Sequence, residues 1–482
     1  MTHPAGKHER RNVLSLFAVL SIVFLLLFNL FSASLEQGTV ASVSAWWILP
    51  FIVLLTAIAS GPFVNRRWWD SNYAFVSYGL GFIVILYYLS YLGVPGRLFR
   101  TFYEYVSFIS LIGSLFVVAG GIHIHIRGKA APWENIMFLG TGAVLSNLLG
   151  TTGASMILIR PYLRTNKYRI RGYHIAFFIF LVANIGGALT PVGDPPLFLG
   201  YLKGVPFFWV FSRVGEIWAF TVVVLLIIFF LIDTYFYRKE SLAVQQAAAH
   251  PDEPQVSGLH NIFFLFVIIG AVFIDRPLMV REVVMWSAAL ASFYTTGKHI
   301  HEKNEFTFHP IKEVTILFAG IFATMIPALD WLDVHGASLG LVTPGQYFWS
   351  SGLLSSVLDN APTYLNFLTA SFGLHGANVD NPHHMQMMLG MASPLSLGLA
   401  NPLQPGAQAI TTETWRYIQA VSVGAVFFGA MTYIGNGPNF MVKSIANHSG
   451  VECPTFFGYI AKYSVPVLLP VFLLVWFLFF RI

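Results

Sequence analysis

Apolar stretches of about 20 residues recur along this chain of 482 residues, and each is long enough to cross the hydrocarbon layer of a bilayer. Charged residues make up only 10% of the sequence, whereas soluble domains carry roughly 25%. We therefore expect one polytopic, all-α membrane protein. The candidate spans are 13–33, 45–63, 72–93, 104–125, 173–200, 206–235, 259–275, 282–297, 312–331, 416–446 and 455–480.

Two further apolar segments, 135–160 and 344–372, are interrupted near their middle by Gly, Pro and polar residues. Each predicts a helical hairpin that enters the membrane and returns on the same side. Irregular backbone at this depth is tolerated only where it is buried in protein or lines a cavity. The expected fold is thus about 11 transmembrane helices plus two re-entrant hairpins.

The distribution of Lys and Arg predicts the orientation of the chain. With the N-terminus inside, 19 of the 27 basic residues lie on cytoplasmic segments and 8 outside, as the positive-inside rule requires. The C-terminus is then external, the first hairpin opens to the cytoplasm and the second to the exterior. The polar segment 238–258 is typical of a flexible cytoplasmic linker between two halves, 1–237 and 259–482. Segment 373–412 predicts an external lid or partial helix.

An internal repeat relates the two halves. GALTPVGDPPLF at 187–198 matches GAMTYIGNGPNF at 429–440 at a constant offset of 242 residues, with six of twelve positions identical. Because Pro removes an N–H and Gly permits unusual dihedral angles, each segment should break its helix midway. The expected break residues are Gly193, Pro195, Pro196, Gly435, Gly437 and Pro438.

The hairpins match more loosely, with SNLLGTT at 146–152 opposite SSVLDNA at 355–361. An odd number of crossings separates the two units, so they should insert with opposite topology. Inverted repeats of this kind are the plan of secondary transporters, whose site lies near the bilayer midplane.

Two hairpin tips and two helix breaks should surround one central volume. Free carbonyl groups at such breaks coordinate cations, whereas free N–H groups favour anions. Hydroxyl, amide and carboxylate oxygens would complete a sodium site. The candidate binding residues are Thr151, Thr152, Ser155, Asn184, Thr190, Asp194, Ser355, Asp359, Asn360, Thr363, Thr432, Asn436 and Asn439.

Asp194 and Asp359 are the most informative of these residues. A carboxylate at membrane depth costs about 2.5–3.5 kcal/mol on insertion scales, which makes it a functional candidate. Such a group can exchange a proton for a sodium ion. The alternative is that each residue only caps the helix that follows it, because Asp is a favoured N-cap and Pro195 suits the first helical position.

Several functional classes are not supported by the sequence. No Walker loop is present, so nothing indicates a nucleotide-driven pump. The single cysteine, Cys453, provides neither a disulfide framework nor a cysteine metal site. The net charge of +5 is explained by cytoplasmic loops rather than by nucleic-acid binding. We expect no enzyme activity and no cofactor, with a sodium ion as the one candidate metal.

The motifs of the hairpins and of the helix breaks resemble those of the ion transporter superfamily. SSVLDNAPTYLNFL is similar to the second hairpin of its antiporter and arsenite branch. GTTGASMILIRP followed by NIGGALTPVGDPPLF resembles a branch labelled as citrate transporters or sodium:proton antiporters. The superfamily includes NhaD-type sodium/proton antiporters, arsenite permeases, citrate transporters and dicarboxylate symporters. The resemblance implies a homodimer of scaffold and transport domains, with elevator-like movement of the transport domain.

The chain departs from these relatives at both hairpin tips. Dicarboxylate symporters carry Ser-Asn-Thr at each tip. This chain instead has Gly-Thr-Thr from Gly150 and Asp-Asn-Ala from Asp359. Antiporters usually place Asp-Asn at the first tip as well, so one expected carboxylate is missing and Asp194 is its candidate substitute.

Three transport functions therefore remain open. The leading hypothesis is sodium/proton antiport in a bacterial inner membrane. The alternatives are sodium- or proton-coupled transport of citrate or another organic anion, and an arsenite or other anion permease. A non-transporting scaffold or receptor would have no need for buried Asp residues and repeated helix breaks.

Overall fold

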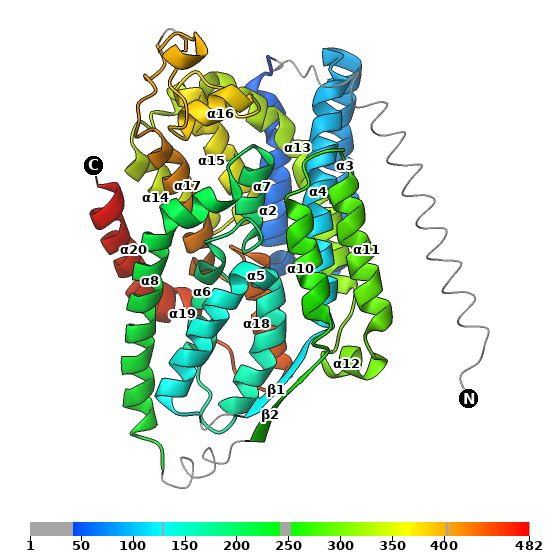
Figure 1. Cartoon of the computed structure of the whole chain (residues 1–482), viewed down its shortest axis with the longest axis vertical. Helices are drawn as coiled ribbons and strands as arrows, with labels where there is room; N and C mark the ends of the chain where they lie inside the picture. Colours follow the sequence, from blue (N-terminus) through cyan, green and yellow to red (C-terminus); the bar gives the residue numbers. More distant parts are fainter. Residues whose placement is uncertain (1–41, 128–129, 242–251, 402, 405, 482) are drawn as a thin grey trace, which may run out of the picture.

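The structure is a computed structural model that describes residues 42–127, 130–241, 252–401, 403–404 and 406–481. Regular structure in these residues is almost entirely helical, which confirms the expected all-α class (Figure 1). Seven stretches within the described residues are long and apolar enough to cross a membrane. The predicted span 13–33 lies outside the described residues.

One set of helices, which we call the support group, packs together on one side of the molecule (Figure 1). Its exposed side chains are largely apolar, as expected of a surface that faces lipid. The members of the support group are α2 (Leu49–Val64), α3 (Arg66–Leu86, continued by a π-helix Tyr87–Leu92), α4 (Pro95–Gly120), α10 (Asn261–Val272), α11 (Val280–Thr295) and α13 (His309–His335).

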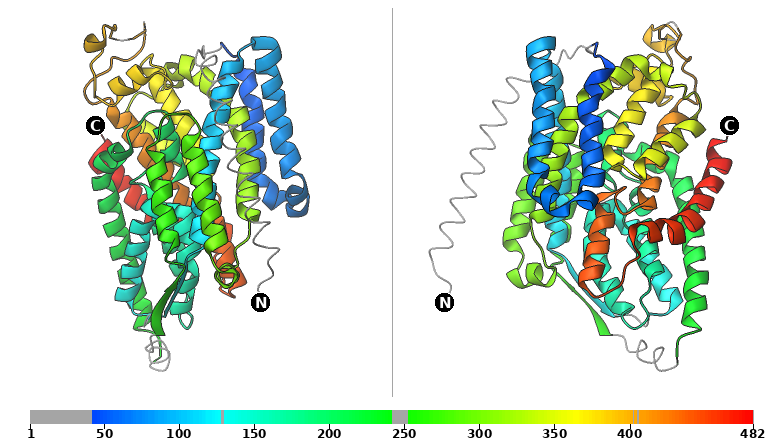
Figure 2. Two further views of the ribbon diagram at one scale, coloured as in Figure 1. Left: turned by 45° about the vertical axis from the view of Figure 1, so that its right-hand side comes forward. Right: turned by 180° about the vertical axis from the view of Figure 1, so that it is seen from behind.

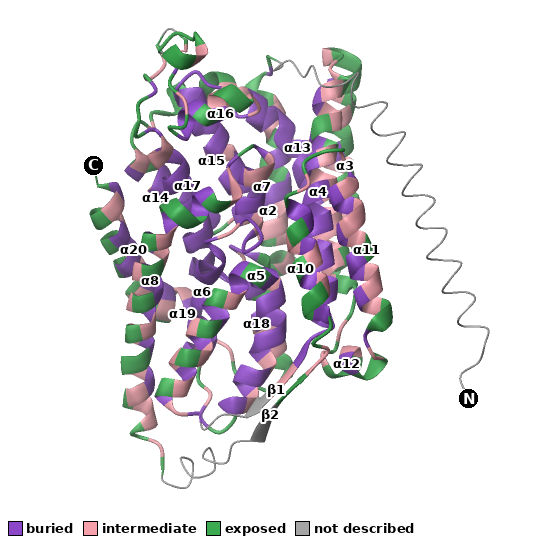
Figure 3. Cartoon of the chain, in the orientation of Figure 1, coloured by how far each residue is buried: buried purple, intermediate pink, exposed green. Residues whose placement is uncertain are grey.

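A second set, the hairpin group, contains both predicted hairpins and both predicted helix breaks. Its members are α5 (Pro132–Thr165), α6 (Gly172–Leu181), α7 (Pro195–Leu202), α14 (Pro344–Ser355), α15 (Asn360–Leu374), α17 (Trp415–Phe428) and α18 (Gly437–His448). Most of these helices are buried (Figure 3). Two longer segments flank the group, namely α8 (Phe207–Tyr237) and the C-terminal stretch Phe456–Phe480, which contains α19 and α20.

The first hairpin is formed by α5, which folds back on itself at Gly150. This glycine has φ 72° and ψ 152°, a backbone conformation that favours a residue without a side chain. Asn135 and Asn166, near the two ends of α5, exchange side-chain hydrogen bonds of 2.9 Å. The Phe138 and Tyr162 ring centroids are 5.3 Å apart. These contacts show that the two arms lie side by side.

The second hairpin consists of α14 and α15, which are joined by residues 356–359. Its arms also lie side by side, because Tyr347 Oη on α14 donates to the Ala370 carbonyl on α15 at 3.1 Å. The α15 helix begins at the tip, where the Asp359 side chain accepts a hydrogen bond from Ala361 N at 3.0 Å.

Both repeated motifs interrupt their helices in the same way. The chain is not α-helical over 182–194 and over 429–436, apart from single 3₁₀ turns at Ile185–Gly187 and Gly429–Met431. A Cβ atom on Gly193 would lie 2.2 Å from the Gly187 carbonyl oxygen, and one on Gly435 would lie 2.7 Å from the Gly429 carbonyl oxygen. Glycine is therefore required where each break crosses over itself.

The two hairpins enter the molecule from opposite ends. The open end of α5 contacts β1 (His123–Arg127), whereas α15 leads to α16 (Pro382–Met388) at the other end (Figure 2). Both tips lie in the middle of the molecule (Figure 1). The two hairpins therefore approach one centre from opposite ends of the molecule.

Short elements close the two ends of the molecule. The β1 strand pairs antiparallel with β2 (Asp252–Ser257), which belongs to the last part of the predicted linker, while residues 242–251 lie outside the described residues. The α12 helix (Lys298–Lys303) lies near the same end (Figure 1). The segment predicted as an external lid or partial helix contains α16 and a 3₁₀ turn at Leu395–Leu397.

Candidate functional site

One fully buried carboxylate, that of Asp194, joins the two hairpin tips and the two helix breaks. Thr151 Oγ1 from the first tip donates to Asp194 Oδ1 at 2.8 Å. Asn360 Nδ2 from the second tip donates to Oδ2 at 2.7 Å, and Asn436 Nδ2 from the second break donates to Oδ1 at 3.1 Å. Asp194 itself belongs to the first break, so all four segments meet at one side chain.

The two acidic candidates have different local roles. The Asp194 side chain makes no capping hydrogen bond to the helix that it precedes, so the hypothesis that it only caps α7 is wrong. Asp359 does cap α15 and is half-buried. A cap uses one carboxylate oxygen, and Asp359 Oδ2 accepts no hydrogen bond from the part of the chain that the structure describes.

A row of buried amides continues from Asp194 into the second break. Asn436 Nδ2 lies 3.2 Å from Asn184 Oδ1, and Asn184 Nδ2 donates to Asn439 Oδ1 at 2.7 Å. Asn439 Nδ2 then donates to the Gly429 carbonyl at 2.8 Å. These three asparagines were predicted as ligands, and the structure brings them into one network with Asp194.

The two threonines of the repeated motif make equivalent contacts. Thr190 Oγ1 donates to the Asn147 carbonyl, and Thr432 Oγ1 donates to the Ser356 carbonyl, both at 2.6 Å. Each hydroxyl therefore fastens a hairpin tip to the neighbouring break. In this structure neither donates to Asp194.

Ser355 and its counterpart Ser146 also fasten the hairpins to the broken helices. Ser355 Oγ donates to the Ala425 carbonyl at 2.5 Å, and Ser146 Oγ donates to the Val182 carbonyl at 2.7 Å. Ser355 was predicted as an ion ligand, but here its hydroxyl proton is used in this contact.

Asn147 is a site residue that sequence reasoning missed. Its Nδ2 donates to the Gly186 carbonyl at 2.7 Å, and its Oδ1 accepts from Leu189 N at 2.9 Å. It thereby fixes the backbone of the first break. The looser repeat contained the signal, because Asn147 aligns with Ser356 at the other tip.

Three further predicted ligands, Thr152, Ser155 and Thr363, also make no hydrogen bond to Asp194 within the described residues. Thr363 Oγ1 donates to the Asp359 carbonyl at 2.9 Å, and Thr152 is half-buried. Ser155 Oγ is buried with no partner among the described residues, and so is Asn360 Oδ1. A buried acceptor without a donor is unusual in a folded protein and is consistent with a water or an ion that binds there.

The charge at this centre is not balanced by the protein. Within the described residues, no Lys, Arg or His forms an ion pair with Asp194, and the charged group that acts on it is Asp359. A buried ionised carboxylate without a partner costs several kcal/mol. The site therefore favours either a proton on Asp194 or a bound cation.

Four helical segments begin at the centre, namely the second arm of α5, α7, α15 and α18. Pro195 begins α7, where a missing N–H has no cost, and Pro438 occupies the first turn of α18. The free N–H groups at such N-termini carry partial positive charge and attract anions. The centre thus combines the buried carboxylate of Asp194 with helix N-termini that suit a negatively charged ligand.

A second buried polar centre at the base of the first hairpin was not predicted from the sequence. Arg169 Nη2 donates to Asp233 Oδ2 at 2.7 Å, and Tyr173 Oη donates to Asp233 Oδ1 at 2.7 Å. Asn135 Nδ2 also donates to Asp233 Oδ2, at 3.0 Å. This cluster joins α8 to the open end of α5, and so holds the first hairpin at the end remote from its tip.

Residues 40–480 of the chain match a protein family described as putative citrate transport. The match covers most of the sequence, so the chain belongs to this family, which is a branch of the ion transporter superfamily. Membership confirms the resemblance inferred from the motifs and identifies the protein as an integral membrane transporter. No curated protein matches the sequence.

Proposed function

We propose that this member of the citrate-transport family is a secondary active transporter that exchanges sodium ions for protons. Asp194 is the group that carries either a proton or a sodium ion, and Asp359 is the second carboxylate of the site. The observation that supports this function is the carboxylate of Asp194, which is fully buried and has no cationic partner in the described residues. Such a group is stable only when a proton or a cation neutralises it.

The contacts of Asp194 indicate how its two states could be linked to movement. Its three donors, Thr151, Asn360 and Asn436, lie on three different segments of the hairpin group. A change from bound proton to bound sodium alters all three contacts at once. The hairpin group would therefore move as a unit relative to the support group and carry the ion with it, in an elevator-like cycle.

The second candidate function is sodium- or proton-coupled transport of citrate or a related organic anion. Two observations favour it: the family description, and the four helical segments that begin at the centre. Helix N-termini of this kind bind substrate carboxylates in transporters with broken helices. In this case the coupling cation would still bind at Asp194.

Purified protein in liposomes that contain a pH-sensitive dye distinguishes these functions. For an antiporter, a sodium gradient drives proton movement without citrate, and radiolabelled citrate does not accumulate. For a coupled citrate carrier, citrate accumulates under a sodium or proton gradient, and the sodium gradient alone moves no protons. Absence of both fluxes in folded protein contradicts both functions and favours another anion, such as arsenite.

Two variants and a matched control assign the flux to the site. Asp194→Asn and Asp359→Asn remove the two carboxylates with little change in volume, and each should abolish coupled flux. Asp70→Asn removes an exposed carboxylate on α3 that lies 3.7 Å from Arg66, and it should retain the wild-type flux. Wild-type coupling in Asp194→Asn would overturn the assignment of Asp194.

A further inference from the structure

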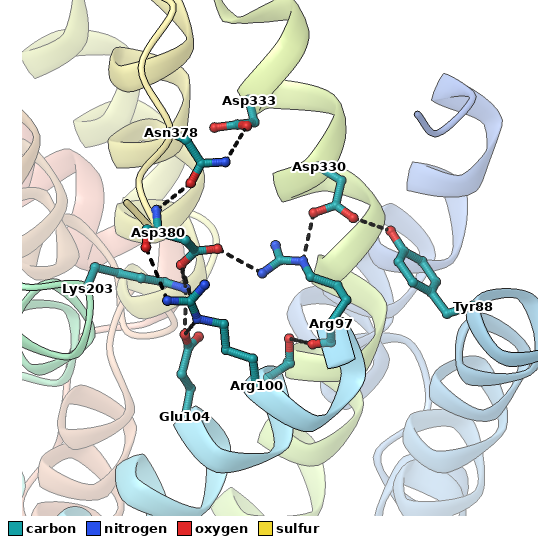
Figure 4. A network of polar contacts seen from close by, with 10 residues as sticks. Tyr88, Arg97, Arg100, Glu104, Lys203, Asp330, Asp333, Asn378 and Asp380 are labelled. Carbon is teal, nitrogen blue, oxygen red and sulfur yellow. Dashed lines mark hydrogen bonds and ion pairs between the residues drawn. The ribbon is translucent and has the colours of Figure 1, made fainter. Parts of the chain in front are cut away.

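A cluster of charged side chains lies between α4, α13 and the segments that follow α7 and α15 (Figure 4). We call it the outer ionic cluster. The support group contributes most of it, and the hairpin group contributes one lysine and one aspartate. The members are Arg97, Arg100, Glu104 and Asp330 from the support group, with Lys203 after α7 and Asp380 after α15.

Three ion pairs of this cluster cross from one group to the other, namely Lys203–Glu104, Arg97–Asp380 and Arg100–Asp380. Lys203 Nζ lies 2.6 Å from Glu104 Oε1 and 2.7 Å from Asp380 Oδ1. Arg97 Nη1 donates to Asp380 Oδ2 at 3.0 Å, and Arg100 Nη2 donates to the Asp380 carbonyl at 3.2 Å. Asp380 thus contacts α4 twice and also contacts the only lysine that the cluster contains.

Both sides of the contact are held in place by further hydrogen bonds. On the support side, Arg97 Nε donates to Asp330 Oδ1, and Tyr88 Oη donates to Asp330 Oδ2, each at 2.8 Å. On the hairpin side, the Asp380 N–H donates to Asn378 Oδ1 at 2.7 Å. Asn378 Nδ2 in turn donates to Asp333 Oδ2 on α13 at 2.8 Å. The charged groups are thus held on both sides of the contact, which makes it specific to one arrangement of the two groups.

The cluster is largely protected from solvent. The side chains of Lys203 and Arg97 are 2% and 7% exposed. Burial alone raises the pKa of the Asp380 carboxyl, but the charges of Lys203, Arg97 and Arg100 outweigh burial and hold that pKa well below its usual range. Asp380 therefore stays ionised, and the pairs are not screened as surface pairs are.

We propose that the outer ionic cluster is a latch that holds the hairpin group against the support group at one end of its travel, and that Asp380 closes it. The latch rests on the proposed function, because it requires the two groups to move relative to each other. Buried salt bridges that repack between two arrangements are a known means of stabilising one state of a moving interface. The latch sets how often the hairpin group leaves this position, whereas Asp194 sets which ion it carries.

Removal of Asp380 should leave a folded protein. Lys203 still has Glu104 as a partner, and Arg97 still has Asp330. The Asp380→Asn variant therefore leaves neither cation without an acid, and it weakens mainly the connection between the two groups. This makes it a cleaner probe than Arg97, whose loss would leave the buried Asp330 without its cation.

Distances between spin labels on the two groups test the latch without any need for transport. Exposed positions for labels are Phe102 on α4 of the support group and Gln386 on α16, which follows the hairpin-group helix α15 and begins two residues after Asp380. Each is changed to cysteine in a Cys453→Ser background that removes the chain's one native cysteine. The wild-type cluster should give mainly one distance. Asp380→Asn should increase the ratio of a second distance to the first by roughly tenfold or more.

Two further variants keep the result interpretable. Glu413→Gln removes an exposed carboxylate that lies 3.4 Å from Arg416, three residues further along the chain. This pair does not connect the two groups, so its loss should leave the distances between the labels unchanged. Arg100→Gln weakens the contact from the support side and should shift the distances in the same direction as Asp380→Asn, by less. If Asp380→Asn did not fold, Arg100→Gln would still decide the matter, because this arginine is 43% exposed.

The outcomes separate the latch from the proposed function. Unchanged distances in both Asp380→Asn and Arg100→Gln overturn the latch, even if the protein exchanges sodium for protons. A shift in distances supports the latch, even if the liposome experiment identifies citrate as the substrate. In a transporting protein, Asp380→Asn should change the maximal rate and leave the sodium concentration for half-maximal rate within about twofold, since Asp194 is untouched.

Discussion

Asp194 and Asn436 occupy equivalent positions in the two repeats, 242 residues apart, and their side chains touch across the centre of the molecule. Asn436 Nδ2 lies 3.1 Å from Asp194 Oδ1. The fold thus brings an acid against its own amide counterpart. The two breaks share glycines and prolines, but only the first break carries a carboxylate, that of Asp194.

This contact predicts the effect of Asn436→Asp, which would place two carboxylates about 3 Å apart. Two carboxylates at this distance cannot both be ionised unless a proton or a cation lies between them. Repulsion grows as protons are lost, so the variant should lose thermal stability as pH rises, and added sodium should restore it. Thermal unfolding in detergent with and without sodium, from mildly acid to alkaline pH, measures both effects.

The control for this variant is Asn72→Asp, which adds a carboxylate on the exposed face of α3. It should show the same dependence on pH and sodium as the wild-type protein. If Asn436→Asp also behaved like wild type, the two side chains could not be in contact at the centre.

The paired threonines predict equal energetic effects in the two repeats. Thr190→Val and Thr432→Val each remove a 2.6 Å hydrogen bond to a carbonyl oxygen at a hairpin tip. Each also removes the acceptor of a backbone N–H in the break, that of Gly193 at 3.0 Å or that of Gly435 at 3.1 Å. Each should lower the free energy of unfolding by about 1–3 kcal/mol, the usual cost of an unsatisfied buried polar group. Chemical unfolding in detergent measures the two losses.

A large loss for only one of the two threonines would contradict the structural equivalence of the breaks. Ser287→Ala is a suitable control, because its hydroxyl is exposed and bonds only to the Val283 carbonyl one helical turn earlier. We expect its unfolding free energy to stay within about 0.5 kcal/mol of wild type.

The glycines of the breaks predict where an added methyl group is tolerated. A Cβ atom at Gly193 would lie 2.2 Å from the Gly187 carbonyl oxygen, whereas nothing lies within 4 Å of a Cβ atom at Gly437. Gly193→Ala should therefore give little folded protein, because the neighbouring atom is backbone and cannot move aside. Gly437→Ala should give wild-type yield on size-exclusion chromatography. Equal yields would show that the first break does not cross over itself as closely as described.

The sequence was most informative where residues act through the backbone. The glycines and prolines of the two motifs predicted helix breaks, and the structure interrupts both helices over 182–194 and 429–436. The turn of the first hairpin was predictable for the same reason, since Gly150 permits a positive φ that other residues avoid. The re-entrant insertion of the two hairpins stays a prediction. The homodimer and the elevator-like movement stay predictions.

Contacts between distant side chains were less predictable. Thr190 and Ser355 were chosen as ligands because they carry hydroxyls, but in the fold both hydroxyls donate to carbonyls of the neighbouring element. Asp233 lies within an apolar span, and its partner Arg169 was assigned to a cytoplasmic loop. Nothing in the local pattern indicates that these two residues, 64 positions apart, form a buried pair.

That pair provides the last prediction. Arg169→Met removes the cation whose Nη2 lies 2.7 Å from Asp233 Oδ2 and leaves the buried acid with its neutral donors and with His174, whose Nε2 lies 3.3 Å from Asp233 Oδ1. The expected loss is about 3–5 kcal/mol in the free energy of unfolding. Arg171→Met is the matched control, because it breaks a 2.8 Å pair with Glu240 in which the arginine is 46% exposed, and it should cost about 1 kcal/mol or less. The double variant Arg169→Met with Asp233→Asn should recover part of the loss, since it removes the unpaired charge while the amide oxygen can still accept a hydrogen bond from Tyr173 or Asn135. Equal losses for the two single variants in chemical unfolding would mean that the Arg169 pair is not buried in the folded protein.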